Sequence, residues 1–422
     1  MKAGMDKDTH YDVLVVGGGA AGMMAAGTAA AKGRRVLLLE QNRRLGEKLR
    51  ISGGGRCNIL NAEQDEKKLL AAYGESEQFL YSTFSQFGMQ DTWKFFEANS
   101  LPLKIERNNR AFPKSEKAAD VVHVLEDYLR TSGVEVKTGV AVSVVLSEGD
   151  RIISVSAGGK HYTADSYIFA TGGRSHPETG STGDGFNWLR TLGHTVKDPT
   201  PTIVPLRTKE PWTRALAGMA AQDVRITFAG EKGTKIKKDQ KRDGVVLFTH
   251  VGISGPTVLN AAGMVADLLH EGSVTAHIDL FPKLDVGGLD RHITEIFDGN
   301  KNKMLRNACR EFLPAGMTDV LLAQVPDIDP EREVHSVTRD ERKRLVHFFK
   351  DISLTVTGLM GFERAVVADG GIPLSEVDMR TMRSLRIKNL LVTGDLLHIT
   401  RPSGGYSLQL CWTTGYVAGL NS

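Results

Sequence analysis

A glycine-rich turn near the start of the chain most constrains its fold. Residues 11–16 form a short apolar run entered from a polar leader, which predicts a buried strand. Gly17, Gly19 and Gly22 follow in the G-x-G-x-x-G spacing. An alanine- and methionine-rich helix is expected over 20–32. In such a turn the first glycine permits a tight bend, the second leaves room for a pyrophosphate and the third lets the helix pack closely, so the pattern predicts a dinucleotide-binding unit.

An acidic residue stands where the next strand should end. Residues 35–39 form a second apolar run, and Glu40 closes it, 18 residues after Gly22. A carboxylate at this point accepts hydrogen bonds from an adenosine ribose and repels a 2′-phosphate. The alternative is a glycine-rich turn in an ordinary α/β unit. The combination of strand, turn, helix and acid favours nucleotide binding.

The composition is that of a globular protein with room for about two or three domains in its 422 residues. A formal net charge of +3 does not indicate nucleic acid as the partner of the whole chain. Cys57, Cys309 and Cys411 lack C-x-x-C spacing, which is typical of a reducing compartment, and we expect neither a disulfide framework nor a metal site. The first ten residues lack the apolar core of a signal peptide, and no uncharged apolar run is long enough to span a bilayer. We therefore expect a cytoplasmic protein without a membrane partner.

The pattern of apolar residues predicts a discontinuous nucleotide-binding domain. Residues 1–199 and 351–422 carry its strands, helices and glycine-rich turns. Alternating stretches predict an inserted β-rich substrate domain over 200–285. Residues 286–350 are charged and helical in pattern, which predicts a helical subdomain.

The C-terminal segment favours FAD among the dinucleotides. An apolar strand over 390–393 runs into Gly394-Asp395, and Gly404-Gly405-Tyr406 precedes the last helix. Asp395 would lie near the ribityl chain or pyrophosphate. The helix N-terminus would face the pyrimidine edge of the flavin, where negative charge develops on reduction. The alternative is a generic strand–helix unit that closes the sheet.

A second glycine-rich motif reads Ser52-Gly-Gly-Gly-Arg-Cys-Asn58. Three consecutive glycines give backbone that a ligand can approach closely. Arg56 and Asn58 are suited to donate hydrogen bonds, and Lys48 to meet a phosphate. Cys57 is interpreted as a buried structural thiol rather than a nucleophile, because nothing nearby marks it as activated. The alternative for the glycines is a flexible surface loop.

Five segments resemble the bacterial flavoprotein family of NAD(P)/FAD-dependent oxidoreductases of the BaiN or aminoacetone-oxidase type. The Ser-Gly-Gly-Gly-Arg-Cys-Asn and Thr-His-x-Gly-x-Ser-Gly-Pro strings are the most specific. The segments are residues 13–22, 52–58, 170–173 with 179–185, 247–256 and 394–419.

The resemblance implies an α/β fold of the glutathione-reductase type: an FAD-binding Rossmann-like domain with an inserted β-barrel-like domain and a helical subdomain. Members of the family are credited with reducing conjugated double bonds in steroid-like acids, oxidising a small amine and reducing a uridine in ribosomal RNA. Their shared step is hydride movement at flavin N5.

The chain departs from the family pattern at positions that the resemblance places near the flavin. These departures imply retained FAD binding in an altered flavin environment. They are Asp for Glu at 395, His398 for Asp, Thr400-Arg401 for Asp-Gly, 368–372 for Thr-Ala-Gly-Gly-Val, and Leu385 for Lys after Ser384.

Four residues are candidate acids or anchors for the reaction. His250, Arg56 and Tyr406 are the predicted catalytic residues, and His398 is a further, unusual candidate. A histidine suits proton transfer near neutral pH. His250 stands before a tight turn, and acid and turn-stabilising roles are both open; His398 is more typical of a loop residue.

The motifs and the resemblance together define the residues expected to contact FAD. They are Gly17, Gly19, Ala20, Ala21, Gly22, Glu40, Gln41, Lys48, Ser52, Gly53, Gly54, Gly55, Arg56, Cys57, Asn58, Val140, Ala170, Thr171, Gly172, Gly173, Asp184, Gly394, Asp395, Gly405, Tyr406, Ser407 and Leu408.

Three functions remain as hypotheses. The favoured one is an FAD-dependent reductase of an activated C=C bond in a small molecule, with NAD(P)H as a transient hydride donor, since no second G-x-G-x-x-G stands out. The second is an oxidase of a small amine. The third is an enzyme whose flavin modifies RNA, with the basic segment 231–243 touching phosphates; a solvated hairpin is the simpler interpretation of that segment.

Overall fold

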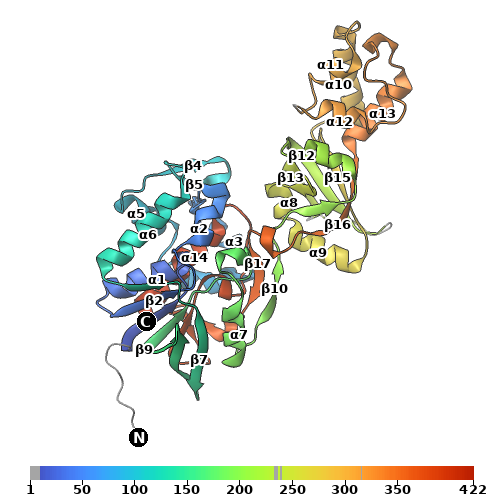
Figure 1. The fold of residues 1–422 in the computed structure, drawn as a ribbon. Helices are drawn as coiled ribbons and strands as arrows, with labels where there is room; N and C mark the ends of the chain where they lie inside the picture. The colour runs from blue at the N-terminus through green and yellow to red at the C-terminus, as the bar shows by residue number, and fades with distance from the viewer. Residues whose placement is uncertain (1–9, 232–235, 238–239, 315) are drawn as a thin grey trace. The chain divides into compact units, whose positions relative to one another are not determined.

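The computed structural model describes residues 10–231, 236–237, 240–314 and 316–422. The chain forms two compact units (Figure 1). The first, here called the parallel-sheet unit, contains the residues up to Thr200 together with Val366–Ser422. The second, here called the barrel unit, contains Pro201–Ala365. Among the described residues, no helix has the length and apolar character needed to cross a membrane.

The parallel-sheet unit is built on β1 (His10–Val16), which lies between β2 (Val36–Glu40) and β9 (Lys160–Phe169) and runs parallel to both. β6 (Glu135–Thr138) extends the sheet beyond β2, and β20 (Leu390–Val392) extends it beyond β9. The central strands are near-continuous apolar runs because both faces of a parallel sheet are covered. This places the ends of β1, β2, β9 and β20 at one edge.

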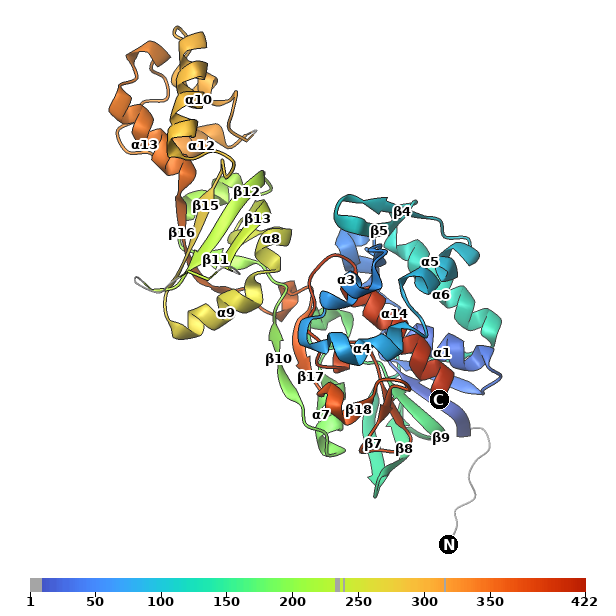
Figure 2. The ribbon, with the colours of Figure 1, turned by 180° about the vertical axis from the view of Figure 1, so that it is seen from behind.

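Smaller strands complete this sheet, as Figure 2 shows from behind. β18 (Val377–Asp378) and β19 (Arg383–Ser384) follow β20 in the sheet, while β7 (Val142–Glu148) and β8 (Arg151–Ala157) form an antiparallel hairpin against the first half of β9.

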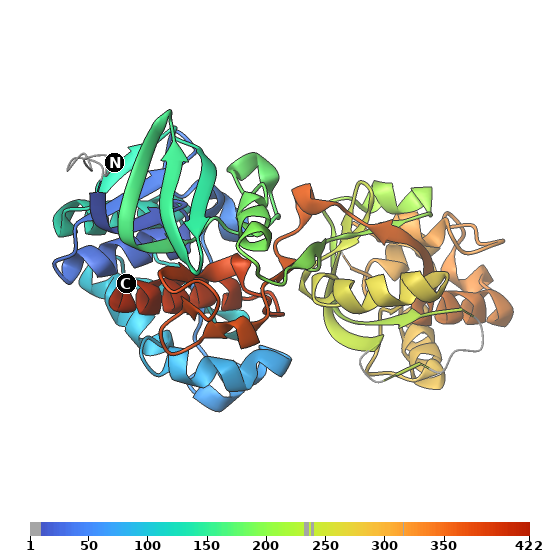
Figure 3. The ribbon, with the colours of Figure 1, turned by 90° about the horizontal axis from the view of Figure 1, so that it is seen from below.

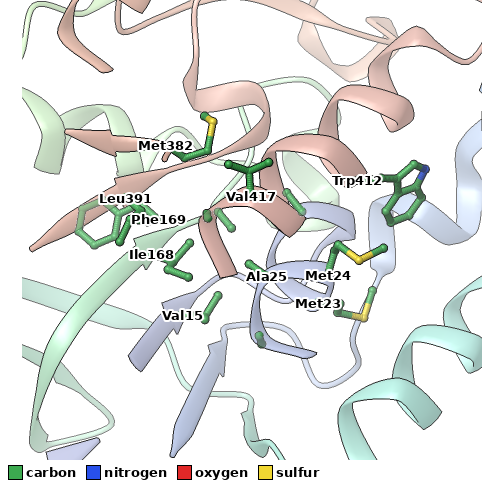
Figure 4. Packing of buried hydrophobic residues seen from close by; sticks show 14 of the residues in the cluster. Val15, Met23, Met24, Ala25, Ile168, Phe169, Met382, Leu391, Trp412 and Val417 are labelled. Atoms are coloured by element: carbon green, nitrogen blue, oxygen red, sulfur yellow. The ribbon is translucent and has the colours of Figure 1, made fainter. Parts of the chain in front are cut away.

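Two helices with small residues at their contact cover the sheet. α1 (Ala20–Ala31) packs against α14 (Tyr406–Asn421), the dark red helix that ends at the C-terminus in Figure 3. A Cβ atom added at Gly415 would lie 2.4 Å from the carbonyl oxygen of Ala21, and one at Gly419 would lie 2.3 Å from that of Ala25. The close approach of the two helices therefore requires glycine at both positions. Figure 4 shows the resulting core of strand and helix side chains.

The remaining elements of this unit surround the sheet and include α6 (Ala118–Ser132), which packs on α1. They also comprise α2 (Glu47–Ile51), the 3₁₀ turn η2 (Ser52–Gly55), β3 (Leu60–Asn61), α3 (Glu66–Ala71), α4 (Glu77–Phe84), α5 (Met89–Ala98), β4 (Leu103–Glu106), β5 (Arg110–Pro113), α7 (Asp184–Thr191), β10 (Lys197–Pro201), β17 (Ala368–Gly371) and η11 (Gly394–Leu396).

The barrel unit contains a closed antiparallel barrel in the order β11-β14-β13-β12-β15-β16. Alternating burial along the strands, as in β15, turns one side chain in two into the core. The strands are β11 (Leu206–Thr208), β12 (Ala220–Ala229), β13 (Lys241–Thr249), β14 (Gly252–Ser254), β15 (Val274–Asp279) and β16 (Ile352–Leu359).

Within the described residues, four α-helices follow β15 and precede β16 in the sequence, and their buried side chains share one hydrophobic core with the barrel. They are α10 (Val286–Gly299), α11 (Leu305–Cys309), α12 (Thr318–Leu322) and α13 (Arg339–Lys350), while α8 (Pro256–Leu259) and α9 (Ala262–Glu271) precede β15.

Residues 351–365 lie in the barrel unit, which ends at Ala365, although the sequence pattern grouped them with the nucleotide-binding domain. β16 pairs with both β15 and β11 and thereby closes the barrel. A strand that completes a closed barrel cannot be assigned from its local pattern, because its partners are distant in sequence.

A buried hydrogen-bonded triplet links α7 to the β18–β19 edge of the sheet. The Nδ1 atom of His194 lies 2.7 Å from Oε2 of Glu376, and its Nε2 atom lies 2.9 Å from Oγ of Ser384. Burial alone would raise the pKa of Glu376, but Arg386, Thr195 and His194 outweigh it and lower that pKa to about 2. Ser384 also accepts hydrogen bonds from the backbone N–H groups of Arg386 and Ile387, so its oxygen stabilises a turn. The triplet is therefore structural rather than nucleophilic.

We expect this triplet to make the protein sensitive to acid. Burial lowers the pKa of His194 below its ordinary 6.5, and the pKa of Glu376 is about 2 instead of 4.5. The unfolded chain therefore binds more protons than the folded chain as pH falls below 6.5, so stability decreases with acidification. Glu376→Gln should lower stability by about 2 kcal/mol at pH 7. Its melting temperature should approach that of the wild type between pH 4.5 and 2; a constant difference over that range would contradict this role.

Candidate functional site

The glycine-rich turn after β1 combines close packing with open space. Gly17 has φ 107°, and an added Cβ there would lie 2.4 Å from the carbonyl oxygen of Ala170. A Cβ at Gly22 would lie 1.8 Å from the carbonyl oxygen of Gly17, whereas one at Gly19 would meet nothing within 4 Å. α1 begins after Gly19 without a side-chain cap and without an acid in its first turn. Its free N–H groups therefore face a space suited to an anion.

Glu40 fixes this turn from the end of β2. Its buried carboxylate accepts hydrogen bonds from the backbone N–H of Gly18 at 2.6 Å and of Asn42 at 2.8 Å. The backbone N–H of Val140 donates to the carbonyl oxygen of Glu40 at 3.0 Å, and Gln41 Nε2 donates to that of Gly180 at 2.5 Å. Glu40 thus organises the loop itself, a role that the spacing alone did not indicate; its contact with a ribose stays a prediction.

Lys48, Asp395 and Arg401 form a partly buried ionic cluster. Lys48 Nζ lies 3.4 Å from Oδ2 of Asp395, and Arg401 donates to Oδ1 of the same carboxylate. Arg401 also donates to the carbonyl oxygen of Ile399 at 2.6 Å and to Oγ of Ser407 at 3.1 Å, and its side chain is 1% exposed. Burial alone would raise the pKa of Asp395, but the two cations hold it below its usual value. The cluster therefore carries net positive charge.

Arg401 belongs to this cluster, although the sequence marked it only as a departure from the family pattern. Its position six residues after Asp395 gave no direct sign of an ion pair. The signal available was the unusual cation itself, in a loop expected to approach the flavin.

The loop after α2 presents open backbone. Gly53, Gly54 and Gly55 have φ values of 57°, 70° and 82°, and a Cβ at either of the last two would meet nothing within 4 Å. Cys57 is fully buried, and burial raises its pKa to about 12, so the thiol stays protonated. This favours the structural interpretation of that thiol. With its amide oriented to suit its neighbours, Asn58 accepts from the backbone N–H of Gly405 at 3.0 Å and so joins this loop to α14.

The side chain of Arg56 is fixed by ion pairs with neighbouring carboxylates. Its guanidinium lies 4.3 Å from the centre of the Phe112 ring, pairs with Glu106 and lies 3.0 Å from Glu116. Lys104 pairs with the same two carboxylates. These contacts indicate that Arg56 positions the glycine loop; its predicted role in catalysis is not tested by them.

The segment after β9 supplies further neighbours of the ionic cluster. A Cβ at Gly173 would lie 3.2 Å from Cβ of Asp395. The Oγ1 atom of Thr171 is buried and makes no hydrogen bond with the described residues. Asp184, in the first turn of α7, accepts from Thr182 Oγ1 at 2.6 Å. A small residue at Gly173 and an unsatisfied hydroxyl at Thr171 fit the approach of a ligand.

The N-terminus of α14 resembles that of α1. Gly405 precedes the helix with φ 103°, there is no side-chain cap, and the first turn contains no acid. A Cβ at Gly405 would lie 2.2 Å from the carbonyl carbon of Leu60, so the close approach of these two backbone segments requires glycine at 405. The ring of Tyr406 packs edge-on to Tyr73, and burial raises the pKa of Tyr406. Its hydroxyl therefore keeps its proton at neutral pH.

The departures at 369, 398 and 400 lie together. Thr400 Oγ1 donates to Oδ2 of Asp369 at 3.0 Å, and Nε2 of His398 lies 3.4 Å from Nζ of Lys197. Burial and the nearby Lys197 lower the pKa of His398, so its imidazole is neutral at pH 7. A neutral histidine can accept a proton but is a poor acid.

The predicted cofactor-contacting residues all belong to the parallel-sheet unit, whereas His250 belongs to the barrel unit. His250 is exposed in the turn between β13 and β14. Thr249 makes the hydrogen bonds of that turn, accepting from the backbone N–H of Val251 at 3.4 Å and donating to the carbonyl oxygen of Gly252 at 3.1 Å. The turn therefore has another stabilising residue, and the role of His250 as an acid stays a prediction.

The residues around the ionic cluster fit a dinucleotide with a diphosphate. Two helix N-termini lack caps and acids, glycine backbone is open at Gly19 and Gly54, and the cluster holds excess positive charge. The Gly17–Gly22 turn would hold the diphosphate. The Gly53–Gly55 loop and the start of α14 would hold the flavin end of the dinucleotide.

Residues 11–421 match the family described as HI0933-like protein Rossmann domain. The chain is 31% identical over 389 residues to a 3-dehydro-bile acid delta(4,6)-reductase of Clostridium scindens, covering 91% of each chain. It is 26% identical over 408 residues to a ribosomal RNA dihydrouridine synthase of Escherichia coli, covering 96% of each.

Solved structures show the same fold at low identity. A 3-ketosteroid-delta4-(5alpha)-dehydrogenase from Rhodococcus jostii has a TM-score of 0.55 at 15% identity, covering 99% of this chain and 98% of that one. A 3-ketosteroid delta1-dehydrogenase from Sterolibacterium denitrificans has a TM-score of 0.56 at 14% identity, covering 97% and 99%. The predicted fold class is confirmed.

Proposed function

Because this chain belongs to the HI0933-like family and is an FAD-dependent oxidoreductase, we propose that it reduces a C=C bond conjugated to a carbonyl group in a small molecule. The observation that carries the proposal is the full-length similarity to a bile acid reductase, together with a site whose glycine turns and cations fit FAD. NAD(P)H is the proposed hydride donor.

The chemistry of both curated relatives supports this substrate class. A steroid Δ4 bond beside a 3-oxo group and the C5=C6 bond of uracil are each conjugated to a carbonyl. Bound FAD supplies a hydride acceptor and donor at N5. Reduction of such a bond needs hydride at the β-carbon and a proton at the α-carbon, while the carbonyl oxygen is held.

The chain offers a proton donor for this reaction. Tyr406 is half-buried at the start of α14 and keeps its proton because burial raises its pKa. The aromatic pair of Tyr406 and Tyr73 fixes the ring, and the Tyr73 hydroxyl donates to the backbone carbonyl of Tyr406 at 2.9 Å. We assign Tyr406 the role of donor to the α-carbon and retain His250 as the alternative acid.

RNA is the second candidate substrate, favoured by the similarity to a ribosomal RNA dihydrouridine synthase. The basic segment 231–243 supports it less strongly. Residues 232–235 and 238–239 lie outside the described residues. Asp243 forms a two-point ion pair with Arg225, at 2.6 Å and 2.8 Å, so this acid and base neutralise each other.

The test follows the flavin absorbance in two stages. The purified protein should be yellow, release FAD on heating and lose its absorbance anaerobically with NADH or NADPH. The reduced protein should then be reoxidised by a 3-oxo-Δ4 steroid acid and not by the matched acid with a saturated ring. Reoxidation only by ribosomal RNA would transfer the proposal to the second candidate. Flavin reduction by a small amine without NAD(P)H would overturn both in favour of an oxidase.

A further inference from the structure

The cluster of Lys48, Asp395 and Arg401 contains one more positive charge than its own carboxylate can balance. Each oxygen of Asp395 faces one cation, Lys48 on one side and Arg401 on the other. Arg401 is 4% exposed as a residue, so water does little to screen it. The two other titratable neighbours, Tyr73 and Cys411, add no negative charge, because burial raises the pKa of both; that of Cys411 is about 12.

Arg401 also lies at the N-terminus of a helix, where a positive charge is unfavourable. Its Nε atom donates to Oγ of Ser407 in the first turn of α14, a helix of 16 residues. Helix N-termini stabilise anions and disfavour cations. This terminus has no cap and no acid in its first turn. Asp395 balances only one of the two cations, so further negative charge in the adjoining space would stabilise this guanidinium.

The position of the cluster separates its two cations. Gly394, beside Asp395, would place a Cβ 3.3 Å from Cβ of Ala21 in the first turn of α1. The backbone beside Asp395 is thus close to the first turn of α1, while Arg401 bonds to Ser407 in the first turn of α14. Arg401 is consequently the cation that contacts the start of α14, whereas Lys48 pairs with the other oxygen of Asp395.

We propose that Arg401 stabilises the negative charge that the flavin acquires on reduction, and so raises the midpoint potential of the bound FAD. Hydride transfer brings two electrons and one proton to a neutral isoalloxazine and leaves one negative charge on it, while the donor loses the same two electrons. That charge would lie against Arg401 and the N-terminus of α14. The inference rests on the proposed binding of FAD in this site, and on no particular substrate.

The test compares the affinity of each variant for oxidised and reduced FAD. By thermodynamic linkage, the ratio of these affinities sets the potential of the bound flavin. Arg401→Met should weaken binding of reduced FAD by about tenfold more than binding of oxidised FAD, a fall in potential of about 30 mV for two electrons. Arg401→Lys keeps the charge and should retain most of the wild-type potential.

Lys48→Met is the matched control, since it also removes one positive charge from the cluster. It should weaken oxidised and reduced FAD alike, because Lys48 pairs with the other oxygen of Asp395 and, among the described residues, only Arg401 of the two cations bonds to Ser407 in α14. Asp395→Asn should shift the potential upward, since it leaves both cations unbalanced, and it decides the question if Arg401→Met does not fold. Each potential is measured by chemical reduction against a reference dye, without substrate.

The outcomes separate this inference from the proposed function. A potential that is unchanged in Arg401→Met, or that changes equally in Lys48→Met, would overturn the role of Arg401 while FAD binding stands. In the wild type, the potential should fall with pH as expected for one proton per two electrons. In Arg401→Met, uptake of a second proton should begin at a higher pH. Absence of FAD from the wild-type protein would instead overturn the proposed function.

Discussion

In Gly19→Val, the apoprotein should remain folded, but its affinity for FAD should fall about a hundredfold or more. This loss is equivalent to at least about 2.7 kcal/mol of binding free energy. Gly19 has φ −82° and ψ −170°, which valine adopts without strain, and an added Cβ meets nothing within 4 Å. The side chain would therefore fill only the space reserved for the pyrophosphate. Flavin fluorescence titration and the melting temperature of the apoprotein measure the two effects.

Gly22→Ala is the matched control for this turn. Its Cβ would lie 1.8 Å from the carbonyl oxygen of Gly17, so the helix must move away from the turn. We expect a loss of about 1–3 kcal/mol of stability together with loss of FAD. Replacing Gly19 at the helix N-cap should cost no more than about 1 kcal/mol. Normal FAD affinity in Gly19→Val would show that the diphosphate does not approach this turn.

Glu40→Arg should weaken FAD binding by about ten- to a hundredfold and destabilise the empty protein as well. The Glu40 carboxylate accepts two backbone hydrogen bonds, including one from Gly18 within the turn. Each charged hydrogen bond contributes roughly 1.5–3 kcal/mol, and arginine cannot accept either. The site is 7% exposed, so the new cation is also poorly solvated. Equilibrium dialysis with FAD and thermal unfolding of the apoprotein measure both effects.

Glu40→Gln separates the two roles of this residue. Glutamine keeps the length and one acceptor oxygen, but its NH2 group would face the second backbone N–H, so one of the two hydrogen bonds is lost together with the charge. If the ribose contact dominates, Glu40→Gln should bind FAD more weakly with little change in stability. If the turn is what Glu40 organises, affinity and stability should fall together. Unchanged affinity in Glu40→Arg would contradict both roles.

Local pattern was sufficient for the elements that carry the cofactor motif. The strand, turn, helix and acid between residues 11 and 40 were all predicted, and β1, α1 and β2 occupy those positions. Each depends on contacts within one βαβ unit, where spacing and apolar runs decide the structure. The last helix was expected from about residue 407, and α14 spans Tyr406–Asn421.

The unit to which the strand over 352–356 belongs could not be assigned from its local pattern, for a physical reason. A strand over 352–356 has the same alternating pattern in a barrel as in an open sheet. Only its partners, β11 and β15, assign β16 to the barrel. The charge of Arg56 likewise gave no sign of its partners Glu106 and Glu116, which lie 50 and 60 residues away in the sequence. They reach it from β4 and from the loop that follows β5.

The sequence by itself determined that the chain holds a dinucleotide, because that property lies in glycines and an acid at fixed local spacing. The tertiary structure decided how charge is arranged around the cofactor. Lys48 and Asp395 are separated by 347 residues, and Arg401 reaches the same carboxylate through a loop. Which ions share a buried site depends on how parallel strands and helix ends meet, and long-range electrostatic pairing leaves no periodic trace in the sequence.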